Sequence, residues 1–237
     1  GAGGMIKRWV ENKGIAVYTS TRVESIRAGA PLTVRLSNGK ELAVDLMISA
    51  AGVLPNIAFL AGSGIECRQG VLTDERLQTN VPGVYAAGDC AEAFDVITGT
   101  SIVSAIQPNA ADQAYCAGMN MVGKKSELKG VTQINVLDTL GLISTSFGQW
   151  AGVPGGEHAE LSDEANFRYI RLEFDGDVLA GYNAIGLTDH IGFLRGLTQS
   201  RVKLGAWKDQ LLRDPMRVPE AYLASAQAQH ARGMRVA

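Results

Sequence analysis

The stretch NVPGVYAAGDCAE at residues 80–92 contains the pattern on which the fold assignment depends. Its centre, GVYAAGD at residues 83–89, is a short apolar run that ends in Gly88 and Asp89. Such a run predicts a buried strand that ends in a loop, which places Asp89 at the carboxyl edge of a sheet, where α/β proteins bind ligands. Gly88 would let the backbone approach a ligand closely, and Asp89 can accept hydrogen bonds from sugar or polyol hydroxyls. A strand followed by Gly-Asp is common by itself, so the flanking segments decide what it means.

A helix is predicted to begin near Gln107 and Pro108 and to continue to residue 122. Proline favours the first helical position because its missing N–H would have no partner there. The first turn of a helix presents unpaired N–H groups and about half a positive charge, which suits an anionic group. The helix is rich in Ala and contains Gly118. These small residues allow close packing against a flat ligand, and they suit a tightly packed core helix equally well.

The first eighty residues predict one helix and several strands. Asn38-Gly39 predicts a type I′ hairpin turn, since both central residues of that turn need positive φ. The segment DLMISAAG at residues 45–52 is apolar almost throughout, as expected of a strand buried on both faces. The predicted elements are a helix over 4–13 that stops at Gly14, strands over 15–19, 22–27, 32–36, 41–44 and 45–52, and a short strand with a turn over 70–80.

The polar, turn-rich segment GKKSELKG at residues 123–130 predicts a domain boundary. Beyond it, apolar Ile170, Leu172 and Phe174 alternate with charged Arg171 and Glu173, which indicates a half-buried strand. The remaining pattern predicts a small α+β domain. Its expected strands cover 133–137, 141–147, 168–174 and 178–185, and its expected helices cover 188–200 and 219–233.

Composition narrows the class of protein. The chain has 237 residues, a formal net charge of −2 and 46% hydrophobic residues, which suits one large or two small globular domains and makes nucleic acid an unexpected partner. No apolar run approaches the roughly 20 residues of a membrane span, and we do not expect the first residues to be a secretory signal. Cys67, Cys90 and Cys116 form no CxxC pair, so we expect reduced thiols in a cytoplasmic protein and no metal site. Cys90, next to Asp89, is expected to act as a small buried hydrophobe.

Three segments together carry a resemblance to a known family. DLMISAAGVLPN at 45–56, GVLTDERLQTNVPGVYAAGDCAE at 70–92 and the Ala-rich helix resemble, in order and spacing, the FAD-dependent pyridine nucleotide-disulfide oxidoreductases. The likeness is strongest to their rubredoxin-reductase, nitrite-reductase-flavoprotein and NADH-oxidase-like branch. The resemblance implies an α/β fold, the C-terminal part of a flavoprotein with two dinucleotide-binding domains. It assigns residues 1–50 to the NAD(P)H-binding domain, 51–125 to the returning FAD-binding segment and 126–237 to an α+β interface or dimerisation domain.

The resemblance also implies a cofactor site. Ala87, Gly88 and Asp89 would lie at the ribityl or pyrophosphate region of FAD, and the helix start at Gln107 and Pro108 would face the reduced ring. Gly52 would allow close approach of a dinucleotide, although Leu54 stands where many members carry arginine. None of these residues is expected to perform acid–base catalysis.

The dinucleotide fingerprint G-x-G-x-x-G does not occur in the chain, whereas the resemblance implies two, both before Gly1. We therefore interpret the chain as the C-terminal portion of such an enzyme, either truncated, cleaved, completed by a partner chain or naturally short, and favour truncation or cleavage. The residue that would distinguish NADH from NADPH would also precede Gly1.

The function expected from the resemblance is transfer of electrons from NAD(P)H through FAD to an acceptor that the sequence does not identify. The isolated chain should be inactive and should form oligomers, because an incomplete domain leaves sheet edges and apolar faces exposed. A non-catalytic subunit or assembly module, holding a partner chain through residues 131–237, is the alternative.

Overall fold

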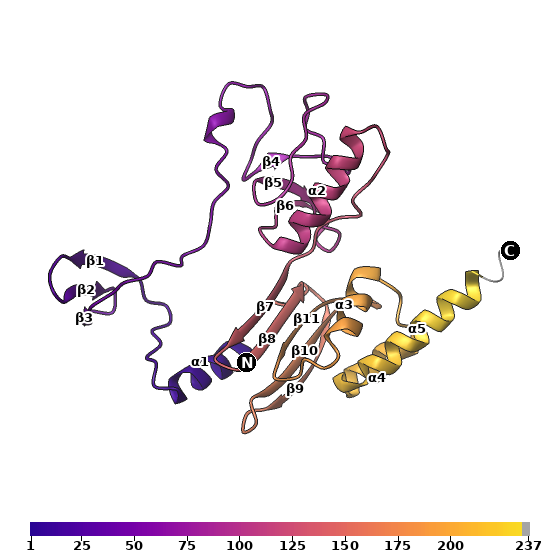
Figure 1. Cartoon of the computed structure of the whole chain (residues 1–237). Coiled ribbons are helices and arrows are strands. Elements are labelled where there is room, and N and C mark those ends of the chain that lie inside the picture. The colour runs from indigo at the N-terminus through magenta and orange to yellow at the C-terminus, as the bar shows by residue number, and fades with distance from the viewer. Residues whose placement is uncertain (234–237) are drawn as a thin grey trace. The chain divides into compact units, whose positions relative to one another are not determined.

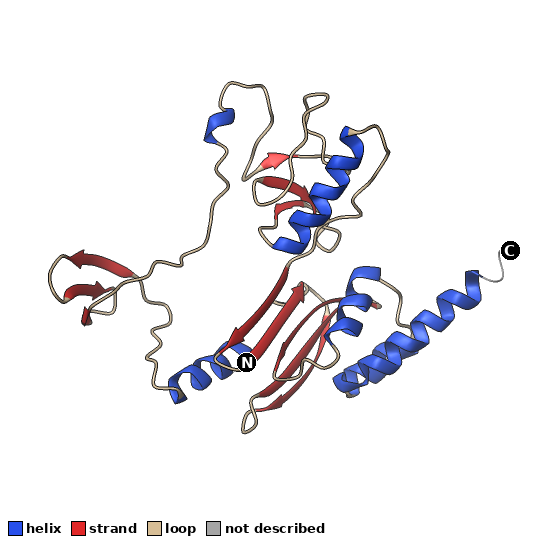
Figure 2. Ribbon diagram, viewed as in Figure 1, coloured by secondary structure: helices blue, strands red, loops and turns tan. Residues whose placement is uncertain are grey.

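The computed structural model describes residues 1–233, with side chains to residue 228, and divides into two compact units (Figure 1). One unit is Lys7–Leu54; the other combines Gly1–Ile6 with Pro55–Ala237. The helices are α1 Ala2–Asn12, α2 Gln107–Met121, α3 Ile191–Ser200, α4 Ala206–Arg213 and α5 Val218–Gly233, with short 3₁₀ turns at Ala58–Leu60 and Pro215–Arg217 (Figure 2). The strands are β1 Val23–Arg27, β2 Leu32–Leu36, β3 Glu41–Val44, β4 Val71–Leu72, β5 Ala91–Phe94, β6 Ser101–Val103, β7 Ile134–Thr139, β8 Leu142–Gly148, β9 Glu157–Asp163, β10 Arg168–Asp175 and β11 Val178–Ile185.

Helix α1 ends at the glycine that the sequence indicated. Gly14 has φ of +86°, and its N–H donates to the Glu11 carbonyl at 2.9 Å. The next N–H, of Ile15, donates to the Val10 carbonyl at 3.3 Å. This pair of bonds satisfies two carbonyls at the helix end, which requires a left-handed residue between them. The predicted helix and its stop are confirmed.

The meander of β1, β2 and β3 is confirmed, but its second turn differs from the prediction. The Leu36 N–H donates to the Lys40 carbonyl, and the Gly39 N–H donates to the Leu36 carbonyl, both at 2.9 Å. Of the two turn residues, only Gly39 has positive φ, at +83°. The connection is therefore a three-residue loop closed by a left-handed glycine, and the predicted type I′ turn is wrong.

Two strands predicted in this unit are absent. Residues 15–19 and 45–52 are not assigned to any strand, and Leu46 and Ile48 are 72% and 79% exposed. A strand exists only through hydrogen bonds to a neighbour, and a strand buried on both faces also needs cover on each face. No other part of the described chain supplies these neighbours, so the two segments remain extended and apolar without forming a ladder.

Residues 55–130 form a small sheet packed against α2. β4 and β5 run parallel, and β5 and β6 antiparallel. A small core lies between this sheet and the helix, made of Leu77, Ala93, Cys116, Ala117 and Val131. The strand predicted over 83–89 is wrong: that segment makes a single bridge, between Tyr85 and Gln78, and the strand begins at Ala91 instead. The strand forms at residues 91–94 because these residues have a neighbouring strand on each side with which to form hydrogen bonds.

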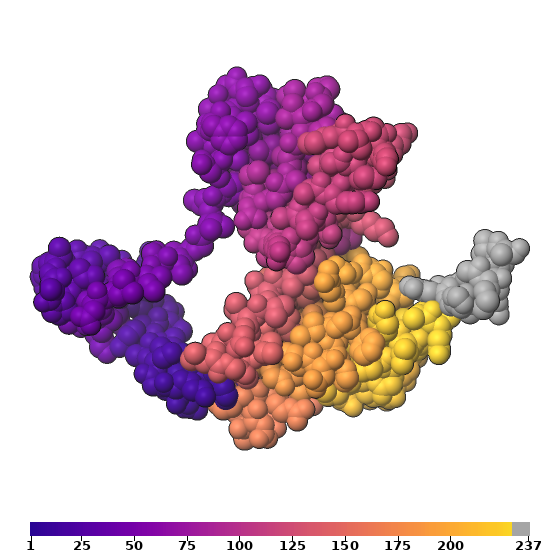
Figure 3. Space-filling view, in the orientation of Figure 1, coloured from indigo at the N-terminus to yellow at the C-terminus, as the bar shows by residue number. Residues whose placement is uncertain are grey.

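The predicted boundary segment, residues 123–130, has no regular structure but is firmly attached. Asn120 at the end of α2 donates to the Ser126 carbonyl at 2.8 Å and accepts from its N–H at 3.1 Å. The Leu128 N–H donates to the Glu75 carbonyl at 2.7 Å. The Val131 N–H then donates to the Phe94 carbonyl at 2.8 Å, which joins the small sheet to the domain that follows. In the space-filling view the surfaces of these two parts of the same compact unit meet (Figure 3).

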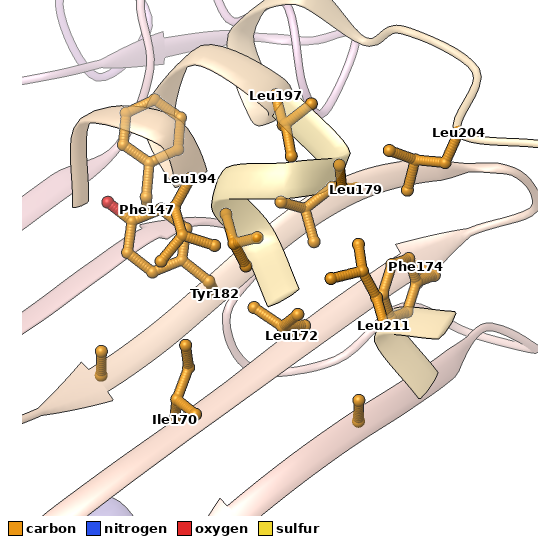
Figure 4. Packing of buried hydrophobic residues seen from close by; sticks show 14 of the residues in the cluster. Phe147, Ile170, Leu172, Phe174, Leu179, Tyr182, Leu194, Leu197, Leu204 and Leu211 are labelled. Atoms are coloured by element: carbon orange, nitrogen blue, oxygen red, sulfur yellow. The ribbon is translucent and has the colours of Figure 1, made fainter. Parts of the chain in front are cut away.

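The C-terminal domain is an antiparallel sheet in the order β7-β8-β11-β10-β9 with helices on one face. Its core combines inward residues of the central strands with residues of α3, α4 and α5, among them Leu172, Phe174, Leu194, Leu197 and Leu211, all 1% exposed or less (Figure 4). The four predicted strands and both predicted helices are present. β9 and α4 were missed; β9 is an edge strand whose sequence, EHAELSD, turns only Ala159 and Leu161 toward the core.

The opposite face of this sheet carries a polar cluster. The Tyr169 hydroxyl donates to Glu160 at 2.9 Å, and Arg171 pairs with both Glu160 and Glu173. Burial raises the pKa of Tyr169 to about 12, and the hydrogen bond to Glu160 and its negative charge add to the shift. The neutral phenol is therefore part of the folded state.

Replacing Tyr169 should change how stability depends on pH. Between about pH 10 and about pH 12 the folded chain keeps the Tyr169 proton while the unfolded chain releases it, so stability falls as pH rises through this window. This tyrosine contributes up to about 2–3 kcal/mol of that fall. In Tyr169→Phe the decline, measured by urea unfolding across the window, should be shallower than in the wild type. Tyr115→Phe, at a tyrosine that is 68% exposed, is the control and should leave the slope unchanged; equal slopes in all three proteins would contradict the assignment.

Candidate functional site

The Gly88–Asp89 turn lies immediately before β5, at the amino end of that strand. Gly88 has φ of +85°, and its carbonyl accepts from the Ala91 N–H at 2.9 Å, which closes a tight turn. Asp89 is exposed, and its carboxylate has no hydrogen bond or ion pair with any described residue. The expected placement at a strand's carboxyl edge is therefore wrong, although the carboxylate is presented at the surface with its acceptor oxygens open.

A buried glutamine fixes this turn against α2. The Gly88 N–H donates to the Gln113 Oε1 at 2.7 Å, and Gln113 is fully buried. A Cβ on Gly88 would lie 3.8 Å from the Ala110 Cβ, so the turn and the helix are in van der Waals contact. Because the bond joins residues far apart in sequence, it sets where Asp89 sits relative to the helix. Gln113 was missed from the sequence; the only signal was a pair of amides, Asn109 and Gln113, four residues apart in an Ala-rich helix.

The start of α2 is open to a ligand. Ile106, the residue before the helix, is extended, no side chain caps the helix, and Pro108 stands in its first turn. Gln107 and Pro108 are exposed. The N–H groups of a first helical turn that lack a capping side chain carry the positive end of the helix dipole and suit an anionic group.

Beside this helix start is a hollow of about 310 Å³, which we call the ring hollow. It is lined by Val103, Ser104, Ala105, Ile106, Gln133, Ile134, Asn135 and Trp150. The first four belong to the segment that leads into α2, and the others come from the C-terminal domain. The two parts are joined here by Asn109, whose amide donates to the Ser104 hydroxyl at 2.6 Å and to the Thr132 carbonyl at 2.9 Å. The volume is at the lower end of the range for sites that hold organic ligands.

The predicted site residues fall into two groups. Ala87, Gly88 and Asp89 lie against the helix that starts at Gln107 and Pro108, and Gln113 connects the two segments. Cys90 is half-buried, and its thiol donates to the Ala87 carbonyl at 3.7 Å. Gly52 lies in the other compact unit, with φ of +95° and open space around it. It adopts the conformation that favours glycine, but it is not part of the arrangement around α2.

Comparison with known proteins gives these features a family. A family model described as pyridine nucleotide-disulphide oxidoreductase matches residues 2–118. The epsilon subunit of NADH-dependent phenylglyoxylate dehydrogenase from Aromatoleum evansii is 34% identical over 223 residues, which are 92% of this chain and 52% of that protein. The chain belongs to the pyridine nucleotide-disulphide oxidoreductase family.

Two further proteins are similar to this chain over most of its length. The large subunit of nitrite reductase (NADH) from Escherichia coli K12 is 28% identical over 218 residues, 89% of this chain and 25% of that protein. The crystal structure of a ferredoxin reductase from Rhodopseudomonas palustris superposes with a TM-score of 0.70 at 26% identity, covering 81% of this chain and 47% of that one. The predicted family and α/β fold class are confirmed, and FAD and NAD(P)H are the cofactors of the family. This chain spans about half the length of the Aromatoleum protein and about a quarter of the length of the E. coli protein.

The residues present fit a flavin nucleotide. Asp89 offers free acceptor oxygens for hydroxyl groups, Gly88 adds no side chain, and the uncapped start of α2 opens beside a hollow of suitable size. Gln113 has, in addition, a buried Nε2 without a hydrogen-bond partner among the described residues.

Substitution of Gly88 should cost stability. Gly88→Ala forces a Cβ into a left-handed conformation, at a cost of about 1–2 kcal/mol in the free energy of unfolding. Gly118→Ala is the matched control, because Gly118 lies inside α2 with nothing within 4 Å of its added Cβ; it should stabilise by about 0.5–1 kcal/mol. Urea unfolding measures both changes. Equal effects of the two substitutions would show that the turn at Gly88 is not held as described.

Proposed function

We propose that this chain provides part of the FAD site of an NAD(P)H-dependent oxidoreductase, which passes electrons from NAD(P)H through FAD to an acceptor. The observation that carries the proposal is the Gly88–Asp89 turn, held by buried Gln113 on the helix whose open start adjoins the ring hollow. Family membership supports it, since the names of the Aromatoleum and E. coli relatives both include NADH.

The residues of this chain would act by binding and orienting. Asp89 would accept hydrogen bonds from the ribityl hydroxyls, and the absent side chain of Gly88, beside Ala87, would leave room for the chain of the cofactor. The start of α2 at Gln107 and Pro108 would stabilise negative charge on the ring edge, as helix starts stabilise anions. FAD, when bound, supplies the two-electron chemistry, and the protein positions the ring and sets its electronic environment. In this proposal Gly52 lets the backbone approach the pyridine dinucleotide.

The proposed domain plan assigns residues 1–50 to the NAD(P)H-binding domain, 51–125 to the FAD-binding domain and 126–237 to the interface domain. No G-x-G-x-x-G occurs in the chain, so the two nucleotide fingerprints would come from residues outside these 237, in the same polypeptide or a partner. The isolated chain should therefore bind FAD weakly and turn over little. Among residues 1–233, no helix combines the length and apolar character that a membrane span requires.

A non-catalytic role in assembly is the second candidate. It is favoured by the name of the Aromatoleum relative, which is a subunit of a larger dehydrogenase. Flavin content and NAD(P)H-dependent dye reduction by the full gene product separate the two roles: an electron-transfer subunit shows both, and an assembly module shows neither.

Removal of the Asp89 carboxylate tests the proposed site. In the full gene product, Asp89→Ala should weaken FAD binding about ten- to a hundredfold, because hydrogen bonds to a charged group contribute about 1.5–3 kcal/mol. Asp112→Ala, at an exposed carboxylate next to Gln113 on α2, is the matched control and should leave the Kd unchanged. Fluorescence titration of FAD into apoprotein gives both values. An unchanged Kd for Asp89→Ala would remove the central residue of the proposal.

The 237-residue chain by itself should lack stoichiometric flavin and should self-associate. Exposed Leu46, Ile48, Val53 and Leu54 lie on an extended segment without strand partners, which favours pairing with a second copy. Sedimentation velocity gives the size, and absorbance in the flavin bands gives the cofactor content. A flavin-free oligomer is expected; a monomer, or a chain that retains one flavin per molecule, would contradict the expectation.

A further inference from the structure

We propose that a second hollow, which adjoins the ring hollow at Gln133 and Trp150, binds a small, uncharged, planar electron acceptor, with Trp150 as its contact residue. This outer hollow has a volume of about 220 Å³ and is lined by Thr98, Gln133, Gly148, Gln149, Trp150, Ala151 and Gly152. The inference rests on the proposed function, because it assumes that the flavin ring lies in the ring hollow.

The two hollows share a wall. Among the residues that the structure describes, Gln133 and Trp150 alone line both of them. Both residues are half-buried. A molecule in the outer hollow and a ring in the ring hollow would therefore both contact Gln133 and Trp150. This closeness makes the outer hollow a position from which an acceptor can receive electrons.

The loop that carries Trp150 is rigidly held. The Gly148 N–H donates to the Gln133 carbonyl at 3.0 Å, and the Gln149 N–H donates to the Ala180 carbonyl at 3.1 Å. The Gln149 side chain also donates to the Ile97 carbonyl at 3.3 Å. A Cβ on Gly148 would lie 2.3 Å from the Ala180 oxygen, and a Cβ on Gly181 would lie 2.5 Å from the Gln149 carbon. No other residue type fits these two positions, so the backbone that leads into Trp150 is held in place.

The lining indicates the chemical class of the acceptor. None of the residues around either hollow is charged. A charged acceptor would lose hydration here and meet no opposite charge, whereas a neutral ring can stack on the indole and accept a hydrogen bond from the Gln133 amide. That amide has no partner among the described side chains or backbone groups. A volume of about 220 Å³ is below the usual range for drug-sized ligands, which limits the acceptor to one or two rings.

Quinones have this chemistry. NAD(P)H and one proton together supply two electrons and two protons, and a quinone takes up all four to become a hydroquinone. The transfer needs no further oxidant or reductant.

The test measures binding of duroquinone to the full chain without flavin. Its four ring methyl groups block addition of cysteine thiols, which matters because all three cysteines are free. Tryptophan fluorescence should be quenched saturably in the wild type and in Trp9→Phe and Trp207→Phe, and this quenching should disappear in Trp150→Phe. By calorimetry, Trp150→Ala should weaken binding about tenfold, while Trp150→Phe, which keeps an aromatic ring, should stay within about threefold of the wild type.

Two results would overturn the inference. One is equal affinity of the wild type and a Trp150→Ala variant whose circular dichroism is unchanged. The other is a sulfonated benzoquinone that binds as tightly as duroquinone, because the site would then accept a charged acceptor. The flavin content of the full gene product is measured separately. If that protein holds FAD but binds quinone independently of Trp150, only the acceptor site is overturned. If it holds no FAD, the proposed function is overturned.

Discussion

One hydrogen bond determines the geometry of the candidate site, the bond from the Gly88 N–H to Gln113 Oε1 at 2.7 Å. Gln113 is fully buried, so leaving either group unpaired would cost about 1–3 kcal/mol. Gly88 makes this bond in a left-handed conformation, with φ of +85°, and Asp89, the next residue, is exposed. A backbone constraint therefore places the one open carboxylate of this segment at the surface beside α2.

Helix α2 connects this turn to the rest of the unit. Its buried face carries Asn109 and Gln113, which make hydrogen bonds, and Cys116 and Ala117, which pack in the small core. Asn109 bonds to the Thr132 carbonyl, so the same helix holds both the Gly88–Asp89 turn and the segment that leads into the C-terminal sheet. The ring hollow forms where these two attachments meet. Its wall toward the C-terminal domain includes Trp150, which follows the end of β8, where Gly148 and Gly181 of β11 leave no room for a side chain.

Local sequence signals predicted much of the fold. Gly14, the alternation at residues 168–174 and the proline at the start of α2 each act over a few residues, and each gave the right element. The strand predictions failed where hydrogen bonding to residues far away in the sequence decides whether a strand forms. Residues 45–52 have the composition of a strand, but the described chain provides no neighbouring strand for them. Residues 83–89 also have this composition, but the neighbouring strands pair with residues 91–94 instead. β9 was missed for the opposite reason, because an edge strand forms by pairing although few of its residues are apolar. Of the site, the Gly-Asp turn and the helix start could be predicted from the sequence, whereas Gln113 and Trp150 act through contacts between segments far apart in it.

A crystal structure of the full gene product with FAD would test the central assignment most directly. We predict that an Asp89 carboxylate oxygen lies within about 3 Å of a ribityl hydroxyl, with the pyrimidine edge of the ring at the start of α2. A bound flavin whose polyol chain contacts other residues, with Asp89 facing only solvent, would contradict the assignment.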